Sequence, residues 1–335
     1  MPHVFPAGYR PNLDLIATQK AIKLAKDTFE RELADALNLT RVSAPLFVER
    51  STGLNDDLNG VERPVQFDIL EQPGVEVQIV HSLAKWKRFA LARYGFPCGE
   101  GLYTDMNAIR RDETTDNLHS LYVDQWDWEL AIGREDRTPD FLRDTVYRIH
   151  DTLRRTLAVL RESFPEIDVE IPEKVSFLTT AELERLYPGL APDERESAYV
   201  RAHGAAFFMG IGWPLANGKP HDGRAPDYDD WSLNGDLVYY HKALDSRMEI
   251  SSMGIRVDEA AMRAQLKAAG CENRAELAFH KALLNGELPL TMGGGIGQSR
   301  LCMLLLGKAH IGEVQSAFWP KEALELYEQN GVTLL

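Results

Sequence analysis

Two sets of charged side chains, spread over separate parts of the chain, have the types needed to bring a carboxylate to a nucleotide. The basic residues are Lys87, Arg110, Arg256 and Arg300, and the acidic residues are Asp56, Asp127, Asp236 and Glu249. Arginine and lysine neutralise phosphates and carboxylates, while acids hold Mg²⁺ or an ammonium group. A site that joins a carboxylate substrate to ATP needs both sets. Each residue alone is more often a solvated surface charge, so this hypothesis depends on the whole pattern.

The stretch 291–307, TMGGGIGQSRLCMLLLG, combines a dense run of glycines with a helical pattern. Glycines 293–295 follow a strand-like approach and allow close contact of the backbone with another group. Leucines between 301 and 305 recur at helical spacing. Arg300 lies in the first turn of this predicted helix, beside N–H groups suited to a phosphate. The simpler interpretation is a glycine bulge packing a buried helix, with Arg300 on the surface.

The composition favours an intracellular protein that does not bind nucleic acid. The 335 residues include 37 basic and 51 acidic ones, for a net charge of −14. This balance opposes a large nucleic-acid interface, which needs a basic face. Cysteines 98, 271 and 302 have no metal-site or disulfide spacing, which favours the reducing cytoplasm. The sequence shows neither a signal peptide nor an apolar run of about 20 residues, so we expect a soluble protein with no membrane partner.

Hydrophobic periodicity predicts an α+β fold with many antiparallel strands flanked by helices. Helices are expected at 13–37, 81–95, 141–164, 258–269 and 273–285. Strands are expected at 41–49 (interrupted by Pro45, hence at an edge), 65–71 and 75–80 (a hairpin turning at 72–74), 102–113, 119–132, 174–179, 205–212, 236–241 and 247–257. Polar loops are expected at 51–60 and 215–235. Residues 13–335 are expected to form one domain, preceded by a flexible segment 1–12.

One predicted strand, 119–132, carries acids and an amide on a single face. Gln125, Asp127 and Glu129 alternate along it and therefore share that side. Such a face is either exposed to solvent or lines a cavity, and the sequence pattern leaves both alternatives open.

Three stretches resemble the signature motifs of class II aminoacyl-tRNA synthetases. These are the helix and strand ending in VSAPLFVE, then AIRRDE at 108–113, and then GGGIGQSRLCMLLL. More closely, HSLAKWKR, GLYTDMNAIRRDE, LYVDQWDWE, RAPDYDDW, LNGDL, SSMGIRVD and GGGIGQSRL together resemble the ammonia-dependent asparagine synthetases. The resemblance runs from about residue 13 to the end of the sequence. It implies a class II antiparallel sheet flanked by helices, and a homodimer built through the first motif.

The same resemblance implies the reaction: ATP-dependent synthesis of asparagine from aspartate and ammonia, with Mg²⁺. The β-carboxylate would attack the α-phosphorus to give β-aspartyl-AMP and pyrophosphate, and ammonia would then expel AMP. Aspartyl-tRNA synthetases carry an anticodon-binding barrel before the first motif, where only about a dozen residues precede the first helix here. No tRNA partner is therefore expected. Glutamine-dependent synthetases use an N-terminal cysteine, whereas Pro2 stands here, so ammonia is the expected nitrogen donor.

Residue by residue, the resemblance also implies a site. The catalytic residues would be Arg110, Gln125 beside the β-carboxylate, and Asp56 as proton acceptor. Lys87 and Arg256 would bind the α-carboxylate of aspartate, and Asp56 and Asp127 its ammonium. Asp236 and Glu249 would hold Mg²⁺. Nucleotide contacts would come from Arg110, Ser120, Ser252 and Arg300, and further contacts from His81, Ser82 and Asp229.

Two positions depart from the family pattern, and the first of them is expected near the nucleotide. Only Ser232 separates Trp231 from Leu233 where the family has a longer loop, and Trp213 replaces a glycine. Two other functions keep the same ATP motifs: an adenylate-forming enzyme with another acceptor, and a sensor without turnover. Sensors of this kind lose motif residues, whereas this sequence retains Arg110 and Arg300.

Overall fold

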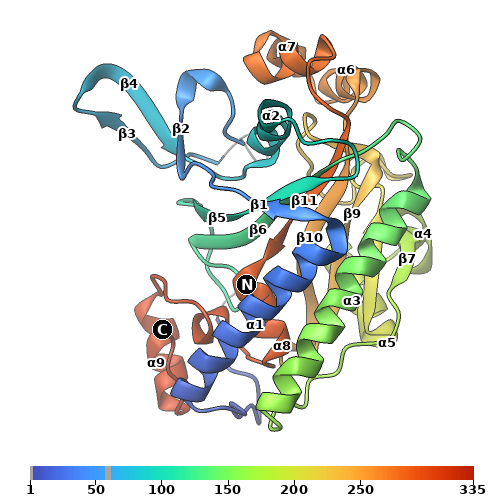
Figure 1. Ribbon diagram of the computed structural model, residues 1–335. Coiled ribbons are helices and arrows are strands. Elements are labelled where there is room, and N and C mark those ends of the chain that lie inside the picture. Colours follow the sequence, from blue (N-terminus) through green and yellow to red (C-terminus); the bar gives the residue numbers. More distant parts are fainter. Residues whose placement is uncertain (1–2, 57–61) are drawn as a thin grey trace.

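The protein is built on one eight-stranded sheet in a computed structural model that describes residues 3–56 and 62–335 (Figure 1). The strand order is β1 (Leu39–Arg41), β5 (Gly101–Ile109), β6 (Tyr122–Ala131), β11 (Thr291–Gly297), β10 (Ser246–Arg256), β9 (Asp229–His241), β8 (Ala205–Met209) and β7 (Ser176–Thr179). The six inner strands are antiparallel, and β1 and β7 pair in parallel at the two edges. The antiparallel sheet expected from the sequence is confirmed.

One face of this sheet is covered by two long helices, α1 (Leu15–Leu37) and α3 (Pro139–Ser163), which lie side by side (Figure 1). Helix α1 begins where Asp14 accepts a hydrogen bond from the N–H of Ala17. Phe29 of α1 packs against Trp126 of β6, with ring centroids 5.0 Å apart. The even-numbered residues of β6 therefore face the helical layer, and the odd-numbered ones face the other side.

The opposite face is covered only at its two sides. Helix α2 (Ala84–Tyr94) packs on β5 and β6. Helices α4 (Thr180–Leu186) and α5 (Pro192–His203) pack on β8 and β9 through Leu183 and Val200. The middle of this face, over β6, β11 and β10, is the place left for a site.

The remaining helices come after β10 in the chain, α6 and α7 before β11 and the others after it. They are α6 (Glu259–Ala268), α7 (Ala278–Leu284), α8 (Gln298–Leu305) and α9 (Lys321–Gln329), with 3₁₀ turns η1 (Arg50–Thr52), η2 (Lys242–Leu244), η3 (Glu272–Glu276) and η4 (Ile311–Glu313). Leu301, Leu304 and Leu305 of α8 are all buried, which fits their helical spacing in the sequence. Among residues 3–56 and 62–335, none of the helices has the length and apolar character that crossing a membrane requires.

A second, three-stranded sheet projects from the main one, with the order β2 (Phe47–Glu49), β4 (Gln72–Ile79), β3 (Gln66–Ile69) (Figure 1). The predicted hairpin is confirmed, but it turns at Leu70–Glu71 and not at 72–74. The prediction of a single strand at 41–49 was wrong. It is two short strands in different sheets, because Pro45 interrupts the backbone between them.

One further expectation needs correction, and the N-terminal segment makes contacts with the rest of the chain. The polar loop expected at 215–235 ends at residue 228, because Asp229 already belongs to β9. The flexible segment expected at 1–12 has contacts over its described part, since Tyr9 donates to Glu313 and Phe5 packs on Tyr327. Pro2 and residues 57–60 of the expected loop 51–60 lie outside the described residues.

Candidate active site

A cavity of about 490 Å³ opens over the middle of the central sheet, on the face away from α1 and α3. Its wall comes from β6, β10, β11 and α8 and from the segments after β5 and before β9. All but one of the residues predicted from the sequence line it: Asp56, His81, Ser82, Lys87, Arg110, Ser120, Gln125, Asp127, Asp229, Glu249, Ser252, Arg256 and Arg300. The acidic face of β6 therefore lines a cavity and is not a solvated surface.

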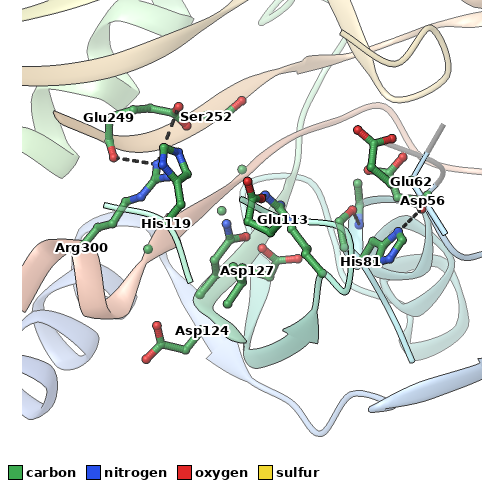
Figure 2. A pocket seen from close by; sticks show the side chains of 18 of the residues that line it. Asp56, Glu62, His81, Glu113, His119, Asp124, Asp127, Glu249, Ser252 and Arg300 are labelled. Atoms are coloured by element: carbon green, nitrogen blue, oxygen red, sulfur yellow. Dashed lines mark hydrogen bonds and ion pairs between the residues drawn. The ribbon is translucent and has the colours of Figure 1, made fainter. Parts of the chain in front are cut away.

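The cavity has two ends (Figure 2). Glu249, Ser252 and Arg300 lie at one, which we call the Arg300 end. Asp56 lies at the other, which we call the Asp56 end. The two ends are continuous across the glycines of β11.

These glycines are required by the side chains that lie on them. A Cβ at Gly295 would collide with Gln125 Oε1. A Cβ at Gly293 would collide with Glu129 and stand 2.6 Å from Arg256 Nη2. The glycines thus let polar groups from β6 and β10 lie against the strand. The predicted close approach is confirmed, whereas the interpretation as a bulge was wrong, because the glycines occupy a central strand.

Arg256 is the most fully paired cation of the Asp56 end. Its Nε lies 3.0 and 3.1 Å from the two oxygens of Glu129, its Nη2 donates to Glu129 Oε2 at 2.7 Å, and its Nη1 donates to Asp229 Oδ1 at 2.5 Å. Burial opposes ionisation of Glu129, but the charges of Arg256 and Lys87 outweigh it and hold its pKa below the ordinary value. The register of β9 against β10 shifts between Gly254 and Arg256, which brings Asp229 alongside.

Lys87 is buried between α2 and the sheet. Its ammonium donates to the carbonyl oxygens of Trp128 and Gly294, both at 3.0 Å, and lies 3.5 Å from Asp127 Oδ2. Burial lowers the pKa of Lys87, with Asp127 acting against that effect. The same carboxylate accepts a hydrogen bond from the N–H of Leu83 at the start of α2. Lys87 therefore fixes the strand geometry beneath the cavity as well as adding positive charge.

Asp56 is buried in a segment held by its neighbour Asn55. Oδ1 of Asn55 accepts from the N–H of Asp56 at 3.0 Å and from the N–H of His81 at 2.8 Å. The His81 ring lies 3.1 Å from the Asp56 carbonyl oxygen and thus helps to hold this segment. Ser82 faces the cavity, and its Oγ accepts from the N–H of Ala84 as α2 begins.

At the Arg300 end a β-bulge places two polar side chains on one face. In strict alternation, positions 249 and 252 would face opposite sides. The extra residue between the pairs Glu249–Val238 and Ser251–Leu237 removes that difference. Arg300, in the first turn of α8, lies 3.8 Å from Glu249 Oε2 and donates to the Glu249 carbonyl oxygen at 3.2 Å.

Asp236 is the one predicted residue that does not line the cavity, because Arg224 covers it. Arg224 donates to Asp236 Oδ1 at 2.6 Å and to Ser252 Oγ at 2.7 Å. Burial raises the pKa of Asp236 to about 7; the nearby Arg224 opposes this shift and Glu249 adds to it. The buried carboxylate of Asp236 thus feels the charge of Glu249, which is about a third exposed, with Arg224 beside it.

Arg110 and Ser120 come from the two sides of the β5–β6 connection. Nη1 of Arg110 is 4.0 Å from Glu113 Oε2, and its buried Nε has no hydrogen-bond acceptor among the described residues. Ser120 Oγ accepts from the N–H of Tyr122 and faces the cavity. Arg110 thus carries donor capacity that a ligand could use.

Comparison with known proteins assigns the chain to a family. The model of a family described as aspartate–ammonia ligase matches residues 16–331. An aspartate–ammonia ligase of Ruminiclostridium cellulolyticum is 59% identical over 330 residues, covering 98% of both chains. One from Lactobacillus acidophilus is 55% identical over 336 residues, covering 100% of both. The chain belongs to the aspartate–ammonia ligase family. It is therefore a carbon–nitrogen ligase that forms asparagine from aspartate and ammonia with ATP, as predicted.

Solved structures show which fold carries this ligase. An asparaginyl-tRNA synthetase of Entamoeba histolytica in complex with asparaginyl-adenylate matches with a TM-score of 0.64 at 15% identity, over 90% of this chain and 66% of that one. One from Pyrococcus horikoshii, also with asparaginyl-adenylate, gives 0.66 at 13%, over 90% and 70%. The class II synthetase fold predicted from the sequence is confirmed.

Sequence reasoning missed Arg224, Glu129 and Asn55 as parts of the ligase site. Glu129 had been placed on the polar face of its strand but given no role, although it holds Arg256. Arg224 begins the stretch RAPDYDDW, which contains the predicted site residue Asp229. A cation beside a cluster of acids in a long loop was the available signal.

Proposed function

We propose that aspartate occupies the Asp56 end, that ATP occupies the Arg300 end, and that the ligase reaction proceeds through β-aspartyl-AMP. The observation that carries this proposal is one continuous cavity with different charge arrangements at its two ends. The Asp56 end pairs buried cations with buried acids at short distances, which suits a small zwitterion. At the Arg300 end, Arg224 is closely paired to Asp236, but Arg110 and Arg300 have their nearest carboxylates 4.0 and 3.8 Å away; two such arginines suit a triphosphate.

At the Asp56 end, Arg256 and Lys87 would attract the α-carboxylate of aspartate. Asp56 and Asp127 would attract its ammonium group, with Ser82 and Asp229 completing the pocket wall. Gln125 lies on Gly295 between the ends, where its amide can donate to the β-carboxylate. Such an arrangement directs the β-carboxylate toward the nucleotide, so that the side chain and not the α-carboxylate reacts.

At the Arg300 end, Arg110 and Arg300 would bind the triphosphate. Their nearest carboxylates, those of Glu113 and Glu249, lie at 4.0 and 3.8 Å, so a phosphate would displace no close ion pair. Ser120 and Ser252 add hydroxyl groups, and Arg224 adds a third guanidinium close to Ser252. Three guanidiniums offset the repulsion between the attacking carboxylate and the triphosphate.

The acids at this end fit Mg²⁺. Asp236 and Glu249 extend from adjacent strands, and the pKa of Asp236, raised by burial and by Glu249, signals negative charge that a cation would relieve. In residues 3–56 and 62–335 no group of three or more metal-binding side chains is present, so phosphate oxygens would complete the coordination. Bound there by these two carboxylates, Mg²⁺ would supply charge neutralisation for the triphosphate.

The chemistry then needs two displacements. An oxygen of the β-carboxylate forms a bond to the α-phosphorus, and the bond to the pyrophosphate oxygen breaks. Ammonia next attacks the acyl carbon, and AMP leaves with the carboxylate oxygen. One proton must leave the nitrogen as the amide forms, and we assign its acceptance to the buried carboxylate of Asp56.

Product analysis tests the proposal. Purified protein would be incubated with aspartate, ATP and Mg²⁺, with and without ammonium. We expect asparagine and AMP in equal amounts, both dependent on ammonium. ADP in place of AMP would contradict the adenylate route. Aspartate-dependent exchange of pyrophosphate into ATP without asparagine would mean that the acceptor is something other than ammonia.

The proposal extends to assembly and location. The projecting small sheet exposes Leu46, Phe47 and Phe67, and an apolar surface of this kind favours a homodimer through the first motif. Light scattering would test this, with Phe47→Asp expected to shift the mass toward the monomer. Residues 13–335 would act as one catalytic domain. The three cysteines are unpaired, which supports a cytoplasmic location.

A further inference from the structure

The N-terminal residues 3–9, which we call the strap, cross the connection between β5 and β6. The N–H of Val4 donates to Asn117 Oδ1 and the Nδ2 of Asn117 donates to the Val4 carbonyl oxygen, both at 2.8 Å. The side-chain amide thus pairs with the backbone of Val4 in both directions, as a neighbouring strand would. His3 adds a ring contact of 3.3 Å to Thr115 Oγ1.

Asn117 is itself buried and fixed from the other side. Its Nδ2 also donates to the Ala309 carbonyl oxygen at 2.7 Å and lies 2.8 Å from the Tyr327 hydroxyl. Its carbonyl oxygen accepts from the N–H of Ile311 at 2.8 Å. The strap and the C-terminal segment therefore hold this residue between them, and the Tyr327 hydroxyl donates to the Val4 carbonyl oxygen as well.

The loop that Asn117 anchors leads directly to both arginines of the Arg300 end. Leu118, His119 and Ser120 line the cavity immediately after it. The Leu118 carbonyl oxygen accepts from Arg300 Nε at 3.4 Å. The Leu121 carbonyl oxygen accepts from the backbone N–H of Arg110 at 2.8 Å. A shift of this loop would move the two guanidiniums proposed to hold the triphosphate.

We propose that the strap positions loop 115–121 for ATP, with Val4 and Asn117 as positioning residues that touch no substrate. The inference rests on the proposed function, because it takes the Arg300 end as the nucleotide end. It assigns a role to a segment that the sequence marked as flexible. Aspartate lies at the far end of the cavity and does not depend on this loop.

The test compares two full-length variants at one position. Val4→Pro removes the N–H that Asn117 accepts, since proline has no backbone donor. Val4→Ala keeps that N–H and trims a side chain that is 47% exposed, so it is the matched control. For Val4→Pro we expect the KM for ATP to rise about fivefold, the size of one lost hydrogen bond, with the KM for aspartate unchanged. Val4→Ala should match the wild type in both constants.

A second variant tests whether Val4→Pro acts only by restricting the backbone conformation. Asn117→Leu keeps the branched shape of the side chain but removes its hydrogen bonds to Val4, Ala309 and Tyr327, so it should raise the KM for ATP by more than Val4→Pro does. If the KM for ATP is unchanged in both variants, the strap has no positioning role and the inference is overturned. Equal increases in both KM values would also overturn it, because they would indicate a structural role only.

Arg300→Lys, measured in parallel, separates the inference from the function on which it rests. A raised KM for ATP in Arg300→Lys with wild-type kinetics in Val4→Pro would overturn the strap alone. An unchanged KM for ATP in Arg300→Lys would instead overturn the assignment of this end to the nucleotide.

Discussion

The two ends of the cavity hold their cations in different ways. At the Asp56 end, Arg256 and Lys87 are buried and paired within 3.1 Å to carboxylates or carbonyl oxygens. At the Arg300 end, Arg110 and Arg300 keep about a quarter of their side chains exposed, and their nearest carboxylates lie 3.8–4.0 Å away. A preformed pocket loses little entropy when it binds a small substrate. A loosely paired arginine can exchange its partner for a phosphate at small cost.

The largest loss of activity is expected from a substitution at the Arg300 end. Arg110→Ala removes a guanidinium that serves the ligand and not the core, so activity should fall about 10³-fold while the fold is retained. Steady-state kinetics with circular dichroism as the fold control would measure this. Arg148→Ala, at an exposed arginine of α3, should leave the rate unchanged. Near wild-type activity in Arg110→Ala would contradict a phosphate-binding role for the loosely paired arginines of the Arg300 end, because this arginine would then be a surface charge.

The next largest effect is a loss of folding stability from a substitution at the Asp56 end, and its size depends on pH. Glu129→Gln leaves buried Arg256 with only Asp229, which should cost about 3 kcal/mol in unfolding free energy at pH 7. The pKa of Glu129 is lowered on folding, so the stabilisation is complete above the ordinary value and lost as pH falls through the lowered one. Urea denaturation should therefore show the difference between wild type and variant shrinking below pH 4.5.

A difference that stays constant from pH 7 to pH 3 would contradict an ionised Glu129 in the folded protein. Glu162→Gln, at an exposed acid near the end of α3, is the matched control and should change stability little.

At the same end, Lys87→Met should raise the KM for aspartate about 10²-fold with little change in the KM for ATP. The ammonium is replaced by an apolar side chain of similar length, so positive charge is lost while volume is kept. Initial rates with each substrate varied in turn measure the split. Equal weakening for both substrates would show that Lys87 supports only the strand beneath the cavity, through its bonds to Trp128 and Gly294.

The smallest effect tests the boundary between the ends. Gly295→Ala introduces a methyl group where Gln125 Oε1 lies, and Asp127 Oδ1 would be 2.7 Å from it. The Gln125 amide can move into the cavity, whereas Asp127 is held by Lys87 and the N–H of Leu83, so we expect about a tenfold loss in kcat with a small fall in melting temperature. Gly189→Ala, at a position with open space around it, is the control. Full activity in Gly295→Ala would mean that Gln125 need not lie against β11.

Local pattern predicted most elements, and the family resemblance named the charged residues that the structure brings to one cavity. The period of α1 and the alternation of β6 were sufficient, because each is set within a few residues. What the sequence could not give was geometry that depends on strand register. Glu249 and Ser252 share a face only through a bulge, and Asp229 meets Arg256 only because β9 and β10 slip against each other.

Long-range contacts escaped prediction for the same reason. Arg224 was read as part of a polar loop, yet its guanidinium reaches Asp236 and Ser252 on two different strands. Val4 was read as flexible, and its partner Asn117 is 113 residues away. Nothing in the local composition distinguishes such residues from solvated ones, because their partners become neighbours only after folding.

An isotope measurement tests the account most directly. Aspartate with both side-chain carboxylate oxygens replaced by ¹⁸O would be converted in the presence of ATP, Mg²⁺ and ammonium, and the products analysed by mass spectrometry. If the β-carboxylate at the Asp56 end attacks the α-phosphorus at the Arg300 end, each AMP carries one ¹⁸O atom and each asparagine keeps one. Unlabelled AMP, with the label in pyrophosphate or in inorganic phosphate, would contradict the proposed arrangement of aspartate and ATP in this cavity.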